Sequence, residues 1–461
     1  MIFPLRLTPF EEYMLLDDQP AYPMNCFFKI KLRGQFDDAA FVSAIQETLK
    51  NHPLLTCSVT ETKGRFYWQP TDTMPVIARK PLEENHPFPA AQKIDLFHEP
   101  ALKMTICHEK PVQANVPLTG QTDIIFEVHH SASDAAGIAQ FIEETLCRYA
   151  QRKGFAGAHT KNVDPSLLRH RGVAKYRSLR YAAKQFWGIF RAWKFLVNRV
   201  IPLTTRKPTE MQKPPAAYPA ILCRNLTEEE TQHIQQRAKQ LEITINDLFL
   251  CSAFLAMEQW QEQHLTDRKK GNLRIAVPIN LRTPADEQMP AANIVSMVFL
   301  DRKPKKIQPV QAFYQGVHRE MQHIKRCHLG WAFIRGLTVY RRVFGNFRKM
   351  MHPERCWTTA TVSNLGKLFA DVSLPLREGR VQLDDSLELI GVEACPPVRS
   401  LTSLGICMMT YAGCMTINIH YDSGVLTRSD AQSILDMLHN YVIPVLTGMT
   451  AHLYQINKGL A

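Results

Sequence analysis

The stretch Ile124-Ile-Phe-Glu-Val-His-His-Ser-Ala-Ser-Asp-Ala-Ala-Gly137 decides how this chain folds. Its first residues are apolar and β-branched, which predicts a strand over 123–128. From Gly137 onward the apolar residues recur at helical spacing, which predicts a helix that buries Ile138 and Phe141. Two histidines and an aspartate therefore stand between a strand and a helix.

The adjacent histidines, His129 and His130, lie at the end of the predicted strand. Because strand side chains alternate in direction, one should face the core and the other an opening, so only one is expected to do chemistry. A neutral imidazole can take the proton of an incoming hydroxyl or amine and act as a general base. Asp134 is spaced to hold the loop through an ion pair or backbone hydrogen bonds. A chance match is the alternative, and a metal site is disfavoured because no Cys or Glu stands at ligand spacing nearby.

The motif His129-His130-x-x-x-Asp134 resembles the signature of the acyl-CoA-dependent acyltransferases related to chloramphenicol acetyltransferase. That superfamily includes condensation domains, polyketide-associated acyltransferases, alcohol acyltransferases and wax ester synthase/diacylglycerol acyltransferases. The resemblance implies an α/β fold of two pseudo-symmetric halves, each a mixed sheet flanked by helices, with a tunnel between them. It places His130 at the centre of that tunnel as the general base, with His129 in support. Where the usual Gly follows the Asp, this chain has Ala135, and Gly137 stands two residues later.

A second segment, Leu273 to Arg282, predicts a buried strand that ends in an arginine. It is similar to a Pro-x-x-Leu-Arg pattern of the same superfamily, as is the later Asn293. Arg282 is the candidate partner of Asp134, because a guanidinium can brace a carboxylate bidentately. The alternative is a solvated arginine at a strand end.

A third segment, Thr361-Val-Ser-Asn-Leu-Gly366, resembles the Ser-Asn-x-Gly segment of the superfamily. The resemblance puts it on the strand that crosses between the two halves. Ser363 or Asn364 is then a candidate hydrogen-bond donor to a tetrahedral oxyanion, or to the base itself. An ordinary turn at a strand end is the alternative.

The composition agrees with a soluble two-part protein. A chain of 461 residues exceeds one ordinary core, and its hydrophobic content is 45%. The 11 cysteines are scattered singly without a Cys-x-x-Cys pair, which favours reduced thiols in the cytosol. The N-terminus lacks the layout of a signal peptide, and no uncharged apolar run reaches the length of a bilayer span. We expect a cytoplasmic protein.

Three regions are predicted: an N-terminal acyltransferase half with the histidine motif, a basic amphipathic crossover or insert, and a C-terminal acyltransferase half, over 1–160, 161–215 and 216–461. The basic stretch 169–207 lies in a region without any Asp or Glu, and 325–351 repeats its mixture of aromatic and basic residues. Such segments fit a solvated crossover helix, a helix at the inner face of a membrane, or a face for an acidic carrier protein or the phosphates of coenzyme A. Nucleic acid is disfavoured, since no recognised binding module accompanies the charge.

Together these features predict an enzyme that transfers an acyl group from acyl-CoA, used as a co-substrate, to a hydroxyl acceptor such as a lipid or alcohol. No permanently bound cofactor and no metal are expected. The first alternative is condensation-type transfer from a carrier-protein thioester to an amine or hydroxyl. The second is a catalytically inactive docking module, for which Ala135 leaves room.

Overall fold

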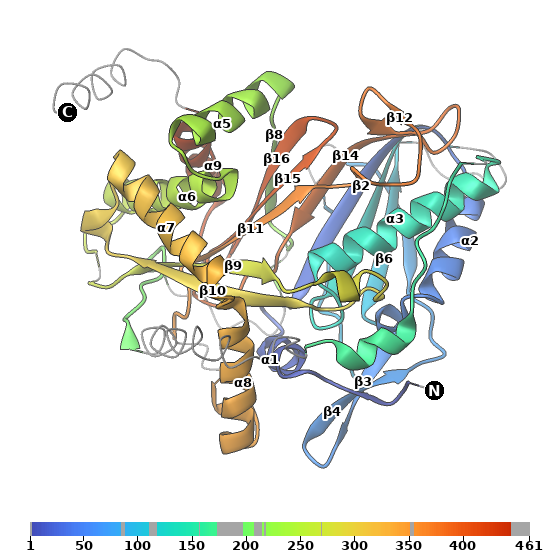
Figure 1. The fold of residues 1–461 in the computed structure, drawn as a ribbon, viewed down its shortest axis with the longest axis horizontal. Coiled ribbons are helices and arrows are strands. Elements are labelled where there is room, and N and C mark those ends of the chain that lie inside the picture. The colour runs from blue at the N-terminus through green and yellow to red at the C-terminus, as the bar shows by residue number, and fades with distance from the viewer. Residues whose placement is uncertain are drawn as a thin grey trace.

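The computed structural model describes most of the chain. The described residues are all except 1, 84–87, 110–117, 156, 173–196, 207–213, 216–217, 269, 351–354 and 444–461. They form two large mixed sheets flanked by helices (Figure 1), which is the predicted class of fold.

The first sheet comes mainly from the N-terminal part of the chain. Its strands lie in the order β14-β2-β7-β6-β5. Their bounds are β2 Asn25–Phe36, β5 Ile77–Pro81, β6 Leu102–His108, β7 Leu118–His129 and β14 Glu388–Cys395. The helices α2 (Asp38–Leu49) and α3 (Ala135–Arg152) cover one face of this sheet (Figure 1). Their apolar faces join the strand residues Phe28 and Phe126 in one buried cluster, so the predicted strand and helix around the histidines pack as a unit.

The second sheet comes from the C-terminal part of the chain, in the order β10-β9-β11-β15-β16-β8. Its strands are β8 Ile221–Asn225, β9 Leu273–Asn280, β10 Val295–Arg302, β11 Ala360–Lys367, β15 Leu404–Tyr411 and β16 Cys414–Tyr421. Its helices are α5 Glu228–Gln240, α6 Ile245–His264, α7 Gln311–Arg326 and α9 Arg428–Val442. The helix α6 is apolar on most of its circumference, because it lies in the middle of the largest core cluster.

Smaller elements complete the fold. A three-stranded sheet has the order β1-β4-β3, and β12 pairs with β13. The bounds are β1 Leu5–Arg6, β3 Cys57–Thr62, β4 Arg65–Pro70, β12 Leu376–Arg377 and β13 Arg380–Val381. The helices α1 (Pro9–Asp17) and α8 (Gly330–Phe344) pack together below the junction of the two large sheets (Figure 1). Short 3-10 turns are η1 Pro53–Thr56, η2 Pro165–His170, η3 Pro284–Asp286, η4 Pro304–Lys306 and η5 Arg348–Met350.

One strand from the C-terminal part of the chain, β14, lies in the first sheet beside β2. The buried Lys29 of β2 pairs with Glu393 of β14 at 2.8 Å, which ties the two regions together. The strand that carries residues 361–366 is β11, and it lies within the second sheet between β9 and β15. The expectation that this strand crosses between the halves is therefore wrong, because β14 makes that crossing.

Most of the predicted basic helix within 169–207 falls on 173–196 and lies outside the described residues. The second basic segment, 325–351, contains α8. Within the described part of the chain, no single helix is long and apolar enough to cross a membrane, and only α5 with α6, bent by 95° from each other, meets that test as a pair. All 11 cysteines are free thiols.

Candidate active site

The turn between β7 and α3 carries the predicted site residues. The strand ends at His129, and the helix begins at Ala135 with Asp134 as its N-cap. The Asp134 carboxylate accepts a hydrogen bond from the Gly137 backbone N–H at 2.9 Å, which satisfies one of the unpaired donors of the first helical turn. The sequence between strand and helix is thus folded around the aspartate.

The backbone and ring of His130 are fixed by three contacts. Its N–H donates to the Met24 carbonyl at 2.8 Å, and its carbonyl accepts from the Asn293 side-chain amide at 2.7 Å. The ring Nδ1 lies 3.0 Å from the Ser133 carbonyl oxygen. Because a carbonyl can only accept, Nδ1 carries the proton of the neutral ring, and Nε2 keeps its lone pair. This is the tautomer that a general base acting through Nε2 requires.

The protonation of His130 is set by its surroundings. Burial lowers the pKa of His130 below its ordinary value, while the Ser133 carbonyl and the nearby Asp134 carboxylate partly oppose that shift. The neutral form therefore dominates at neutral pH, so the ring is ready to accept a proton.

His129 points the other way and is fully buried. Its Nδ1 accepts a hydrogen bond from the Ser131 N–H at 3.2 Å, and its Nε2 lies 3.5 Å from the Asp18 carboxylate. Burial by itself would raise the pKa of Asp18, but His129 and Lys93 hold it below its usual value. His129 thus anchors the end of β7 to the segment before β2.

Asp134 and Arg282 are paired, as the sequence predicts. Arg282 Nη1 lies 2.7 Å from Asp134 Oδ2, which also accepts the Ile294 N–H at 2.7 Å. The pair is not bidentate, because Arg282 Nη2 donates to the Ala292 carbonyl at 2.9 Å. Burial opposes ionisation, yet Arg282 and the backbone donors hold the pKa of Asp134 below its ordinary value. Asp134 therefore joins the start of α3 to the loop between β9 and β10, and both of its carboxylate oxygens accept hydrogen bonds within the protein.

Gly137 allows this loop to approach the helix closely. A Cβ on Gly137 would lie 2.4 Å from Ser133 Oγ and 3.0 Å from the Ala292 nitrogen. Ala135, in contrast, is an ordinary first residue of α3 and does not have a positive φ angle. The alanine that replaces the usual glycine therefore needs no special backbone conformation.

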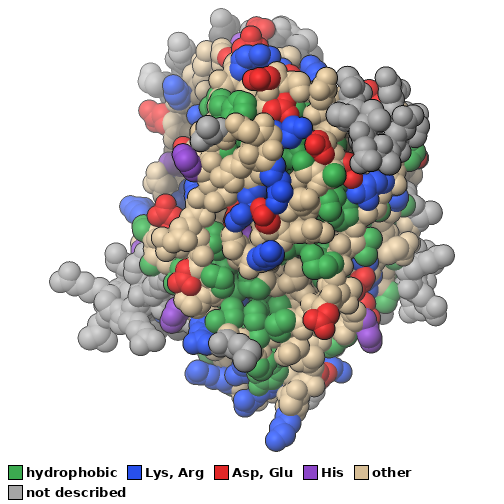
Figure 2. All heavy atoms as spheres, turned by 90° about the vertical axis from the view of Figure 1, so that its right-hand side faces the viewer, with side chains coloured by type: hydrophobic (Ala, Val, Ile, Leu, Met, Phe, Trp, Pro, Cys, Tyr) green, Lys and Arg blue, Asp and Glu red, His purple; other side chains and the backbone are tan. Residues whose placement is uncertain are grey.

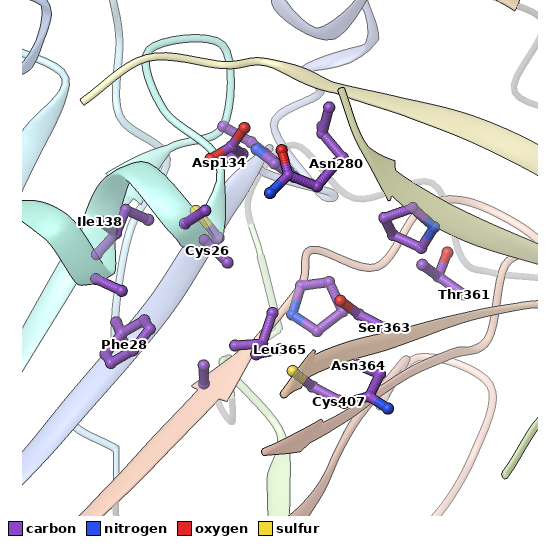
Figure 3. Close-up of a pocket in the computed structure, with 18 of the residues that line it drawn as sticks. Cys26, Phe28, Asp134, Ile138, Asn280, Thr361, Ser363, Asn364, Leu365 and Cys407 are labelled. Atoms are coloured by element: carbon purple, nitrogen blue, oxygen red, sulfur yellow. The ribbon is translucent and has the colours of Figure 1, made fainter. Parts of the chain in front are cut away.

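A cavity of about 510 Å³ lies between the two large sheets, and His130 is part of its wall. Figure 3 shows side chains that line it from both sides. Cys26 and Phe28 of β2 and Ile138 of α3 come from one side, and Asn280, Thr361, Ser363, Leu365 and Cys407 of the second sheet come from the other. The volume falls within the range of small-molecule sites, roughly 300–1,000 Å³. The predicted site residues His130, Asp134 and Ser363 thus meet at one cavity.

The two candidate oxyanion donors differ in orientation. In Figure 3 the Ser363 oxygen is directed into the cavity, and Ser363 stands opposite Cys407 of the neighbouring strand β15. Asn364 follows it on the strand and is exposed, and its Oδ1 accepts the Gly366 N–H at 2.9 Å. Ser363 is the better placed of the two.

One part of the cavity is an apolar chamber, by which we mean the apolar side chains of the cavity wall that come from α1, the residues before β2, β10 and α8. They are Phe10, Tyr13, Met14, Met24, Val295, Met297, Phe299 and Phe333. Most of these side chains pack in one cluster, with Phe333 at 5.8 Å from Phe10 and 5.4 Å from Phe299 between ring centroids. The chamber is suited to an alkyl or aromatic group.

Two residues outside the predicted site support the histidine motif. Asn293 was noted, but its bond to the His130 carbonyl could not be foreseen, because the two residues are far apart in sequence. The buried His52 accepts the Ala291 N–H at 2.8 Å through Nδ1 and pairs with Glu144 of α3 at 2.9 Å. Both residues hold the loop 291–294 against the histidine motif.

The described residues contain no group of three or more His, Cys, Asp or Glu side chains that could hold a metal ion.

The whole described fold is similar to solved acyltransferase and condensation structures. TRI3 trichothecene 15-O-acetyltransferase from Fusarium sporotrichioides matches with a TM-score of 0.67 at 12% identity, over 95% of this chain and 94% of that chain. The first condensation domain of the calcium-dependent antibiotic synthetase matches with a TM-score of 0.67 at 14% identity, over 95% of each chain. A mutant starter condensation domain of rhizomide synthetase, in complex with C8-CoA, matches with a TM-score of 0.64 at 14% identity, over 95% of this chain and 94% of that chain.

No family model and no curated protein matches the sequence itself. The structural matches extend over nearly the full length, so the chain has the two-lobed fold of the chloramphenicol acetyltransferase-like acyltransferases and condensation domains. This is the fold that the histidine motif predicts.

Proposed function

We propose that this protein is an acyltransferase that moves an acyl group from an acyl-CoA thioester to a hydroxyl acceptor. The observation that carries the proposal is the hydrogen bond from His130 Nδ1–H to the Ser133 carbonyl, at the wall of a cavity between the two sheets. That bond fixes the neutral tautomer and leaves Nε2 as a proton acceptor.

In the proposed reaction, His130 Nε2 takes the proton of the acceptor hydroxyl. The hydroxyl oxygen attacks the carbonyl carbon of the thioester at the same time. The new C–O bond forms and the C–S bond breaks, and the proton held by His130 passes to the departing thiolate. The Ser363 hydroxyl is proposed to donate to the oxyanion of the tetrahedral intermediate. Asp134 and Arg282 act by holding the loop, since their hydrogen bonds are directed to each other and to backbone groups.

For the substrates, we propose acyl-CoA as the donor, because a structurally similar condensation domain is described in complex with C8-CoA. A hydroxyl acceptor is supported by the similar 15-O-acetyltransferase. The apolar chamber favours an acceptor or acyl group with an alkyl or aromatic part, which is why a lipid or alcohol is proposed. We also propose a cytoplasmic location, consistent with 11 free thiols.

A second candidate is transfer from a carrier-protein thioester to an amine or hydroxyl. It is supported by the similarity to condensation domains, and to a part covering 32% of the chain of a four-domain non-ribosomal peptide synthetase. His130 and the residues that hold it would have the same roles in both reactions. The two reactions differ in the acyl donor.

The test is release of free thiol from a panel of acyl-CoA donors, with alcohol, glycerolipid or amine acceptors. We expect acceptor-dependent release that falls by about 10²–10⁴-fold in His130→Ala, which is the usual contribution of a general base. The matched control is His264→Ala, because His264 of α6 also bonds through Nδ1 to a carbonyl, that of Trp260 at 2.9 Å, away from the cavity.

Three outcomes would contradict the proposal. Release only from a carrier-bound thioester would favour the condensation reaction. Release in His130→Ala equal to that of the wild type would remove the histidine from the mechanism. No release from either donor type would favour a docking module.

A further inference from the structure

The helix α8 has two faces with different surroundings. Ile334 and Leu337 are buried against α1, and Phe333 contributes to the apolar chamber. The opposite face carries Val339 and Val343, which are 58% and 67% exposed. One helix thus has the cavity wall on one side and an open apolar surface on the other.

The open surface of α8 is also basic. Arg335, Val339, Arg342 and Val343 are exposed and lie at helical spacing on one face, and we call these four residues the outer face of α8. Phe344, 55% exposed, follows at the helix end. The chain contains no Asp or Glu between Glu320 and Glu354.

This combination is uncommon on the rest of the described surface. Three of the nine exposed large hydrophobic residues in the described part of the chain lie within the last six positions of α8, namely Val339, Val343 and Phe344. Single exposed apolar residues need no explanation, but a group of them framed by arginines indicates an interaction site. The lower edge of the molecule in Figure 2 has Lys and Arg side chains beside hydrophobic ones. Both α8 and the hairpin of β3 and β4 reach this end in Figure 1, and the hairpin is on the side that Figure 2 faces.

Two arginines of the segment are paired with acidic side chains of this chain. Arg341 is directed inward, where its guanidinium pairs with Glu12 of α1 at 2.7 Å, and it helps to fix α8 to the body. Arg348 lies 3.4 Å from Glu61. The exposed basic side chains that carry the inference are Arg342 on the outer face of α8 and Lys325 and Arg326 at the end of α7.

We infer that the outer face of α8 docks the protein on an anionic lipid surface. Val339, Val343 and Phe344 would lie in the acyl boundary, and Arg342, Lys325 and Arg326 would lie at lipid phosphates. An amphipathic helix with apolar and basic residues on one face is the pattern of such interfacial binding. An acidic protein would be attracted by the same charges, but the exposed valines and Phe344 favour a partner with an apolar layer directly behind its anionic groups.

The inference adds a place of action to the proposed function. A helix with its side chains is about 10–12 Å across, so docking through the outer face brings the chamber beside Phe333 within about that distance of the lipid. The alkyl chain of a lipid substrate would then enter the chamber from the surface on which the protein sits.

The test is co-sedimentation of the full chain with vesicles of phosphatidylcholine alone or mixed equally with phosphatidylglycerol. We expect binding to the anionic vesicles that is weakened about tenfold or more by Val343→Glu and by about fivefold by Arg342→Gln, the loss expected for one cation at a lipid surface. The matched control is Val76→Glu, because Val76 is 59% exposed and stands in the loop before β5. Thermal unfolding of each variant verifies that it is folded.

Equal binding to both vesicle types, or equal losses in Val343→Glu and Val76→Glu, would overturn the inference. A third result would also overturn it: the wild type binds an acidic acyl carrier protein but no vesicles, and Val343→Glu loses the carrier protein. Sedimentation requires no turnover, so this result is separate from the outcome of the thiol-release assay.

Discussion

The pair of Asp134 and Arg282 can be tested by a double-mutant cycle with Asp134→Asn, Arg282→Met and the double variant. Arg282→Met removes a contact of 2.7 Å to a carboxylate that is 5% exposed and another of 2.9 Å to the Ala292 carbonyl. Loss of one partner of a buried pair costs about 3–5 kcal/mol of the free energy of unfolding, because the other charge stays buried. Asp134→Asn keeps the N-cap, since Asn caps as well as Asp, and should cost roughly 2–3 kcal/mol for the lost charge-assisted bond.

The double variant loses the shared contact only once, so we expect a coupling energy of about 2 kcal/mol. Thermal and denaturant unfolding measure it, and each kcal/mol corresponds to about 2–4 °C in Tm for a unit of 150–250 residues. Arg79→Met is the matched control, because Arg79 pairs with Asp38 at 2.6 Å but is 39% exposed, so its loss should cost about 1 kcal/mol or less. A coupling energy under about 0.5 kcal/mol would show that the pair does not brace the loop.

The same cycle has a predictable dependence on pH. The folded-state pKa of Asp134 is lowered, so its contribution to stability is present above the unfolded value of about 3.9 and is lost as the pH falls through the folded value. The difference in the free energy of unfolding between wild type and Asp134→Asn should therefore shrink in acid. A difference that grows as the pH falls would mean that Asp134 is protonated in the folded protein.

Three further outcomes are expected at the site. Because burial lowers the pKa of His130, kcat/KM should rise with pH to a plateau with its midpoint below about 6.5, and a midpoint above about 7 in a pH-rate profile would contradict this. Gly137→Ala should lower the free energy of unfolding by about 1–3 kcal/mol, because its Cβ would meet Ser133 Oγ at 2.4 Å. Gly336→Ala in α8 should raise it by about 0.5–1 kcal/mol, because no heavy atom lies within 4 Å of its Cβ, and thermal unfolding measures both changes. Ser363→Ala should lower kcat by about 10²–10³-fold, and a larger loss in Asn364→Ala would reassign the oxyanion donor.

The fold and the centre of the site could be predicted because their signals are local. The strand and the helix on either side of His130 follow from hydrophobic spacing over a few turns. The pairing of Asp134 with Arg282 could be predicted from complementary charge within a family pattern. The alternation of strand side chains correctly implied that the two histidines face opposite ways, but it did not identify which of the pair enters the cavity.

The rest of the site depends on contacts between distant segments, which the sequence pattern does not specify. That β14 rather than β11 crosses to the first sheet is a matter of sheet order, and each strand has a suitable apolar pattern. The choice between Ser363 and Asn364 required knowing how each side chain is directed, because both line the cavity and the Asn364 Oδ1 is bonded to the Gly366 N–H. The hydrogen bond from Asn293 to the His130 carbonyl spans 163 positions, so no local sequence pattern predicts it.

These long-range contacts mean that the proposed base is positioned by both parts of the chain together. The segment before β2 accepts the His130 N–H through Met24, while the loop 291–294 holds the His130 carbonyl through Asn293 and the Asp134 carboxylate through Ile294. Local opening of that loop would release both anchors without unfolding either sheet. Activity should therefore be lost at a lower denaturant concentration than the bulk of the secondary structure, and circular dichroism beside the thiol-release assay measures the two midpoints. Coincident midpoints would show that the loop opens only when the whole protein unfolds.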